Sequence, residues 1–260
     1  MADDLSDFLS TCGPTPDRPL LGLTVLAVED SRFACEAMRL LCLRSGARIR
    51  RADCLRSARR HLMSYRPTVV IVDLGLPDGS GLDLIAEIAA GRPRVPALLA
   101  TSGDEGAAEA ALAAGADAFL PKPVESLSAF QRSVLGALPA APRPAAPAPV
   151  PSLPVPSRLL APGAAPPAAQ AEDDRVHPDP LALRDDLAHV ADLLGDDPQG
   201  IALDYLAQFL SGIALSAHDA PLRAAAEALA LDRRDGRGHG PDMRRISGLV
   251  RDRLAAGSPI

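Results

Sequence analysis

Short runs of β-branched and aliphatic residues alternate with amphipathic helical stretches between Leu23 and about Leu138. The strand-like runs span 23–28, 48–52, 68–73, 95–101 and 117–121, and the helical stretches span about 31–45, 54–64, 81–90, 105–114 and 124–137. Strands that alternate with helices predict βαβ units and a parallel sheet covered on both faces. The runs 23–28 and 68–73 are nearly all apolar and should be central strands, whereas the arginine-rich run 48–52 should lie at an edge. We therefore predict an α/β domain with a five-stranded parallel sheet.

The composition changes sharply after this domain. Eleven prolines lie between Pro139 and Pro167, so this stretch lacks the N–H donors that a helix or a sheet ladder needs and should be a semi-rigid or disordered spacer. Helical periodicity then returns in about 181–195, 198–215, 220–231 and 242–256, which predicts a small all-α bundle. The expected division is a flexible N-terminal extension (1–21), the α/β domain (22–138), a Pro/Ala-rich linker (139–178) and a helical output or docking domain (179–260).

Charge and apolar run length limit the classes of partner. A formal net charge of −6 argues against nucleic acid as the main partner, although a local basic patch stays open. The apolar runs are shorter than the roughly 20 residues that cross a bilayer, and the N-terminus is acidic, unlike a secretory leader. We therefore expect a cytoplasmic protein without membrane insertion. Because no C-x-x-C pair occurs, we expect reduced, packed thiols at the four cysteines, Cys12, Cys35, Cys42 and Cys54.

Charged residues follow three of the predicted strands. Glu29 and Asp30 come directly after the run 23–28, Asp73 ends the run 68–73, and Lys122, the only lysine of the chain, follows the run 117–121. Ligands of an open parallel α/β sheet collect outside the carboxyl ends of its strands, so we expect these side chains to converge. A chain that otherwise uses arginine but keeps one lysine favours a compact point charge at that place.

This set of residues suits phosphoryl transfer. Asp73 can act as a nucleophile toward phosphorus and form an aspartyl phosphate, while a divalent metal and Lys122 would neutralise the phosphoryl oxygens. Glu29, Asp30 and Asp73 supply the hard oxygen ligands that Mg²⁺ takes. Without a cation, each carboxylate pair at about 4 Å would cost on the order of 4 kcal/mol at an effective dielectric near 20.

The same region resembles the flavodoxin-like receiver domain of two-component response regulators. The motifs that carry the resemblance are Glu29-Asp30 and the segments 72–82, 98–102 and 119–123. The resemblance implies that a histidine kinase or a histidine phosphotransfer protein phosphorylates Asp73 and that Thr101 donates its hydroxyl to the phosphoryl group. It also implies that Phe119 is the aromatic switch residue and that the Lys122–Pro123 peptide bond is cis.

Two positions depart from the family's usual pattern. Gly75, two residues after the acceptor, and Gly103, two after Thr101, stand where family members often carry larger side chains that govern the access of water. The lifetime of the phosphorylated state is therefore open.

The C-terminal half carries less specific signals. Segments 193–197 and 203–210 resemble the early helices of histidine phosphotransfer domains, but the comparable stretch 243–249 has no histidine, so a degenerate domain of this type would serve for docking. His218 and His239 are the candidate phosphoryl sites there; Pro221 and the glycines beside His239 favour solvated loop histidines instead.

Three functions follow from these patterns. The leading hypothesis is a phosphoacceptor that is not an enzyme in the usual sense and that signals to an unknown downstream protein through protein contacts. A second is a transcription regulator whose DNA-binding helices lie within 220–256, with phosphate contacts from Arg244, Arg245, Arg251 and Arg253. A third is an aspartate-nucleophile hydrolase. Gly75 counts against it, since no second carboxylate stands two residues after Asp73.

Overall fold

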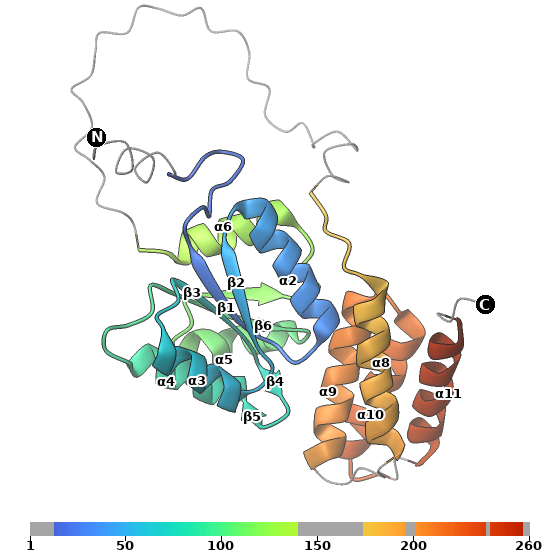
Figure 1. Cartoon of the computed structure of the whole chain (residues 1–260). Coiled ribbons are helices and arrows are strands. Elements are labelled where there is room, and N and C mark those ends of the chain that lie inside the picture. The colour runs from blue at the N-terminus through green and yellow to red at the C-terminus, as the bar shows by residue number, and fades with distance from the viewer. Residues whose placement is uncertain (1–12, 140–173, 196–200, 238–239, 257–260) are drawn as a thin grey trace, which may run out of the picture.

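The structure is a computed structural model that describes residues 13–139, 174–195, 201–237 and 240–256. Its main sheet has the strand order β2-β1-β3-β6-β7, and all neighbouring strands are parallel (Figure 1). The strands are β1 (Thr24–Val28), β2 (Arg48–Ala52), β3 (Val69–Asp73), β6 (Ala97–Ser102) and β7 (Ala118–Pro121). The predicted parallel α/β sheet is confirmed, with β3 and β1 inside and the arginine-rich β2 at an edge.

Two helical layers cover the sheet because its strands are apolar on both faces. Alternate residues of β1, such as Val25 and Leu26, enter different cores. One core packs against α2 (Arg32–Ser45) and α6 (Leu127–Ala137), and the other against α3 (Leu55–Ser64), α4 (Gly81–Ala90) and α5 (Ala108–Ala113). Figure 1 shows these layers on opposite sides of the sheet.

One small element was not predicted. A two-stranded hairpin, β4 (Gly75–Leu76) with β5 (Gly79–Ser80), directly follows β3. Gly79 has a φ of 145°, which a residue with a side chain rarely adopts, so glycine permits this turn. The hairpin holds the backbone after Asp73 next to the carboxyl edge of the sheet.

The thiols and the helix lengths largely follow the expectations. Cys35 and Cys42 are buried in α2 and Cys54 is half-buried, all as free thiols; Cys12 lies outside the described residues. A 3₁₀ turn at Glu105–Ala107 shortens the fourth predicted helix of the domain, and Ser126 caps α6 three residues later than predicted.

The described residues from 174 onward contain four helices, as predicted: α8 (Pro180–Gly195), α9 (Ile201–Ser216), α10 (Ala220–Arg234) and α11 (Gly240–Ala256). Their apolar faces form a third core that includes the predicted leucines of α9. Opposite charges meet within the bundle at Asp204 and Arg233, whose atoms Oδ2 and Nη2 lie 2.9 Å apart. None of the helices within the described ranges is long and apolar enough to span a membrane.

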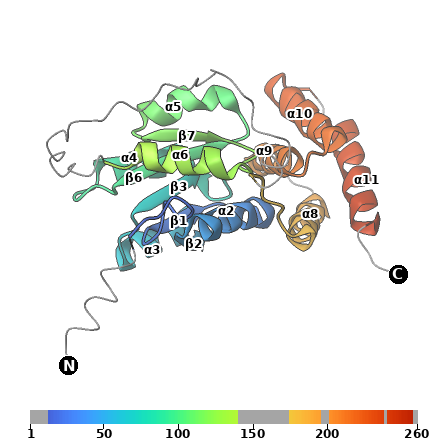
Figure 2. The same cartoon turned by 90° about the horizontal axis from the view of Figure 1, so that it is seen from above.

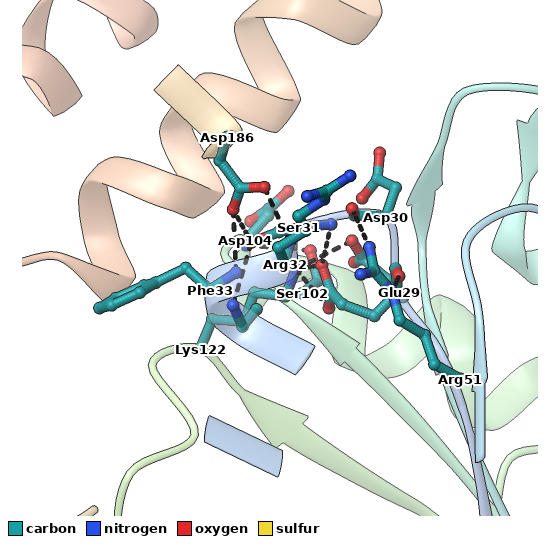
Figure 3. A network of polar contacts seen from close by, with 12 residues as sticks. Glu29, Asp30, Ser31, Arg32, Phe33, Arg51, Ser102, Asp104, Lys122 and Asp186 are labelled. Atoms are coloured by element: carbon teal, nitrogen blue, oxygen red, sulfur yellow. Dashed lines mark hydrogen bonds and ion pairs between the residues drawn. The ribbon is translucent and has the colours of Figure 1, made fainter. Parts of the chain in front are cut away.

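The helical bundle packs against the N-terminal end of α2, beside the sheet (Figure 2). The buried carboxylate of Asp186 on α8 accepts hydrogen bonds from Ser31 Oγ at 2.7 Å, Arg32 N at 2.8 Å and Phe33 N at 3.0 Å. An anionic side chain here satisfies backbone donors of the first turn of α2 and complements the helix dipole. Asp186 thereby links the helical bundle to the α/β domain through the start of α2, as Figure 3 shows.

The ends of the expected extension and linker are packed where the structure describes them. Leu20 is fully buried, and its N–H donates to Ser45 O at 2.9 Å. Val176 is buried in the core beside α6, and its N–H donates to Glu125 O at 3.0 Å. The remainder of both segments, 1–12 and 140–173, lies outside the described residues.

Candidate functional site

The carboxyl ends of four parallel strands bring the predicted residues together. Glu29 and Asp30 follow β1, Asp73 ends β3, Thr101 lies near the end of β6, and Lys122 follows β7. One carboxylate oxygen from each of the three acidic residues lies within 4.8 Å of the others. The convergence expected from the strand ends is therefore present in the structure.

Lys122 is the cation at the centre of the cluster. Its buried Nζ lies 2.9 Å from Asp73 Oδ2, 3.0 Å from Glu29 Oε1 and 2.9 Å from Glu29 Oε2, of which the first two have hydrogen-bond geometry. Burial alone would lower its pKa, but the carboxylates of Asp73 and Glu29 raise the pKa of Lys122 above its usual value. The lysine is therefore charged throughout the physiological range.

The acidic residues carry more negative charge than one lysine neutralises. Burial, together with the charges of Asp73 and Asp30, raises the pKa of Glu29 to about 8 against the opposing charge of Lys122. Burial, followed by the charge of Asp73, raises the pKa of Asp30 to about 7. Among the described residues, Glu29 Oε2 and Asp30 Oδ1 have no hydrogen-bond partner. The unpartnered buried oxygen Asp30 Oδ1 and two carboxyl groups with raised pKa values fit a hard divalent cation such as Mg²⁺.

These pKa values predict how stability changes with pH. In metal-free protein the pKa values of Glu29 and Asp30 lie above their ordinary values of 4.5 and 3.8, so the folded state binds more protons than the unfolded state between those values and about 8. The free energy of unfolding should therefore fall as pH rises through this window, and Mg²⁺ should reduce the fall. Urea unfolding across the window tests this, with Glu29→Gln as the control in which the slope should be shallower. A stability that rises steadily to pH 8 in metal-free protein would contradict the prediction.

The two predicted switch residues lie on neighbouring strands. Thr101 is fully buried, is in register with Asp73, and its Oγ1 has no hydrogen-bond partner in the described part of the chain. Phe119 on β7 is half-buried and packs against the core beside α4. The Lys122–Pro123 peptide bond is cis, as the resemblance implied.

The bundle supplies residues to this site that the sequence did not identify. The hydroxyl of Tyr205 on α9 donates a hydrogen bond of 2.7 Å to Asp30 Oδ2. A cavity of about 760 Å³ lies between the acidic cluster and α9, and Gln208 lines it together with Asp73 and Gly75. No local pattern in the sequence could have revealed these residues, because their roles depend on how the two domains pack.

His218, a candidate phosphoryl site of the C-terminal half, lies elsewhere. It is an exposed residue after α9, and its Nε2 lies 2.6 Å from Glu125 Oε1 of the α/β domain. It does not line the cavity at Asp73. His239 lies outside the described residues.

Comparisons with known proteins agree with this geometry. Residues 25–132 match the sequence model of the response regulator receiver domain. These residues form a receiver domain. Curated relatives include the KDP operon transcriptional regulatory protein KdpE of Escherichia coli, 33% identical over 38% of this chain, and the probable transcriptional regulatory protein TcrX of Mycobacterium tuberculosis, 36% identical over 39%. The match spans 44% of the length of each relative, so more than half of each relative has no counterpart in the match.

Two solved structures are similar to part of this chain. A putative response regulator from Chloroflexus aurantiacus is 28% identical, with a TM-score of 0.40, and the match covers 44% of this chain and 97% of that one. The receiver domain of a sensor histidine kinase from Pseudomonas aeruginosa, with a magnesium ion coordinated in its active-site cleft, is 26% identical, with a TM-score of 0.41 and coverage of 45% and 97%. The C-terminal bundle lies beyond residues 25–132, which match the receiver-domain model.

Proposed function

We propose that this protein is a response regulator of a two-component phosphorelay that accepts a phosphoryl group on Asp73. The phosphoryl donor is a histidine kinase or a histidine phosphotransfer protein. The observation that carries the proposal is the approach of Lys122 Nζ to Asp73 Oδ2, 2.9 Å, beside the buried carboxylate of Glu29 and the half-buried Asp30. A phosphoacceptor needs this combination of nucleophile, counter-cation and metal ligands in one place.

Each residue has a separate task in the transfer. A carboxylate oxygen of Asp73 attacks the phosphorus, and the bond from phosphorus to the donor histidine breaks. Mg²⁺, held by Glu29, Asp30 and Asp73, would neutralise the phosphoryl oxygens. Lys122 stabilises the charge that remains, and the free Thr101 hydroxyl can donate to a phosphoryl oxygen once it forms. Thr101 and Phe119 then transmit the change as the switch.

The output of the protein is a contact with another protein. Support comes from the bundle itself, which packs through α8 and α9 on the receiver domain and so is able to recognise a protein surface. The competing DNA-binding hypothesis relies on arginines of α11, yet Arg253 bonds to Asp219 through Nε at 2.7 Å and Nη2 at 3.1 Å. Phosphorylation and dephosphorylation of Asp73 are the only reactions that we assign to this protein, which acts in the cytoplasm.

A labelling experiment tests the proposed function. The full chain is incubated with a radiolabelled small phosphodonor, such as acetyl phosphate, with Mg²⁺ or with EDTA. We expect a label that requires Mg²⁺ and that hydroxylamine removes, since hydroxylamine cleaves acyl phosphates. Absence of label with Mg²⁺, or a label resistant to hydroxylamine, would overturn the proposal.

A further inference from the structure

One face of α9 lies over the phosphoacceptor site. Tyr205, Gln208, Gly212 and Leu215 follow one another at spacings of three and four residues, which places them on the same side of a helix. Tyr205 bonds to Asp30, and a Cβ built on Gly212 would lie 3.8 Å from Lys122 Nζ. The helix therefore reaches the residues that surround Asp73.

Two of these side chains fill places that the receiver domain leaves open. A Cβ built on Gly75 would overlap the carboxamide of Gln208, with Oε1 at 2.8 Å. A Cβ built on Gly103 would lie 3.4 Å from Leu215 Cδ2. Because positions 75 and 103 lack side chains, α9 can bring Gln208 and Leu215 to the acceptor. The bundle thus supplies the side chains, Gln208 and Leu215, that lie beside these two glycines.

The environment of Gln208 suits contact with water. Its side chain is exposed and faces the cavity that Asp73 and Lys122 also line. Its carboxamide forms no hydrogen bond with any described residue, so both its oxygen and its nitrogen are free to bind water or a phosphoryl oxygen. Contacts of Asp186, Tyr205 and His218 with the receiver domain help to hold α8 and α9 in place beside it.

We propose that Gln208 orients the water that hydrolyses the aspartyl phosphate on Asp73, so that the bundle shortens the phosphorylated state of its own receiver domain. This inference rests on the proposed function. The water oxygen attacks phosphorus, the bond between phosphorus and the Asp73 oxygen breaks, and the products are the Asp73 carboxylate and dihydrogen phosphate. The acyl phosphate dianion and water thus give two monoanions, and both water protons leave with the phosphate. In other phosphoryl hydrolyses, a glutamine amide positions the attacking water in the same manner.

The test compares formation and loss of the phosphate in the full-length protein. Protein labelled with acetyl phosphate and Mg²⁺ is separated from the donor, and the release of inorganic phosphate is followed. Gln208→Ala should still accept label but release it roughly tenfold to a hundredfold more slowly, since a positioned polar group commonly contributes at least this much. Gln131→Ala is the matched control: it removes a carboxamide from α6, where Nε2 bonds to Ser45 Oγ at 3.2 Å outside the cavity, and should leave both rates unchanged.

A second variant separates positioning from a general effect on packing. In the wild-type background, Gly75→Ala should displace the Gln208 carboxamide and slow hydrolysis. In the Gln208→Ala background, the same substitution should slow hydrolysis little further, because the two changes act on one contact. Hydrolysis that is as fast as wild type or faster in Gln208→Ala would overturn the inference, since Gln208 would then have no role or would exclude water. If the wild-type protein takes up no label, that result contradicts the proposed function and not this inference alone.

Discussion

Asp73→Asn is expected to abolish labelling by small phosphodonors in the presence of Mg²⁺. The amide has nearly the volume of the carboxylate, but it is not a nucleophile and carries no charge for the metal. Label should fall to about one hundredth of the wild-type amount or less, because no other carboxylate of the cluster has both the lysine contact and the place at the end of β3. The measurement is the amount of hydroxylamine-sensitive label per protein chain.

The matched control for this variant is Asp83→Asn. Asp83 is an exposed aspartate in the first turn of α4 and does not line the cavity at Asp73. Its label should equal that of wild type. Labelling that survives Asp73→Asn unchanged would refute Asp73 as the acceptor.

Lys122→Met is expected to have the second large effect, on both stability and labelling. The variant keeps the length of the side chain but leaves Asp73 and Glu29 without their buried cation. Breaking a buried ion pair by removing one partner costs about 3–5 kcal/mol in free energy of unfolding. Labelling should be lost as well, because Lys122 neutralises the charge that develops on the phosphoryl oxygens. Urea unfolding without metal and the labelling assay measure the two effects.

Lys122→Arg is the control that keeps the charge. It should retain part of the labelling but uncouple the switch, because a planar guanidinium cannot replace a compact ammonium between two carboxylates and close to Gly212. A Lys122→Met protein that is as stable as wild type and labels normally would show that the lysine is dispensable.

The convergence of the site could be predicted because it follows from topology. Glu29 and Asp30 follow one strand-like run, Asp73 ends another, and Lys122 follows a third. Parallel strands end at the same edge of a sheet. The edge position of β2 was predictable for a similar reason, since an arginine-rich strand cannot be buried on both faces. The hairpin β4–β5 was missed because strands of two residues leave no periodic pattern.

The docking of the bundle on the site could not be predicted. Tyr205 and Asp30 are far apart in the chain, and the contact joins a phenol to a carboxylate that is already part of another cluster. The helical period of α9 predicted its buried leucines, but it cannot show which surface meets the polar face of the helix. Likewise, the sequence shows that positions 75 and 103 are glycines without side chains. It does not show that Gln208 and Leu215 of the bundle occupy the space beside them, because that depends on how the two domains pack.

The most direct test of the central claim is to locate the phosphoryl group. Reduction of the labelled wild-type protein with borohydride converts an aspartyl phosphate to homoserine, and tandem mass spectrometry of the peptides then identifies the position. The account predicts homoserine at residue 73, formed with Mg²⁺ and absent with EDTA. Homoserine at another aspartate, the reduced hydroxy product at a glutamate such as Glu29, or a phosphoryl group found on His218 would contradict it.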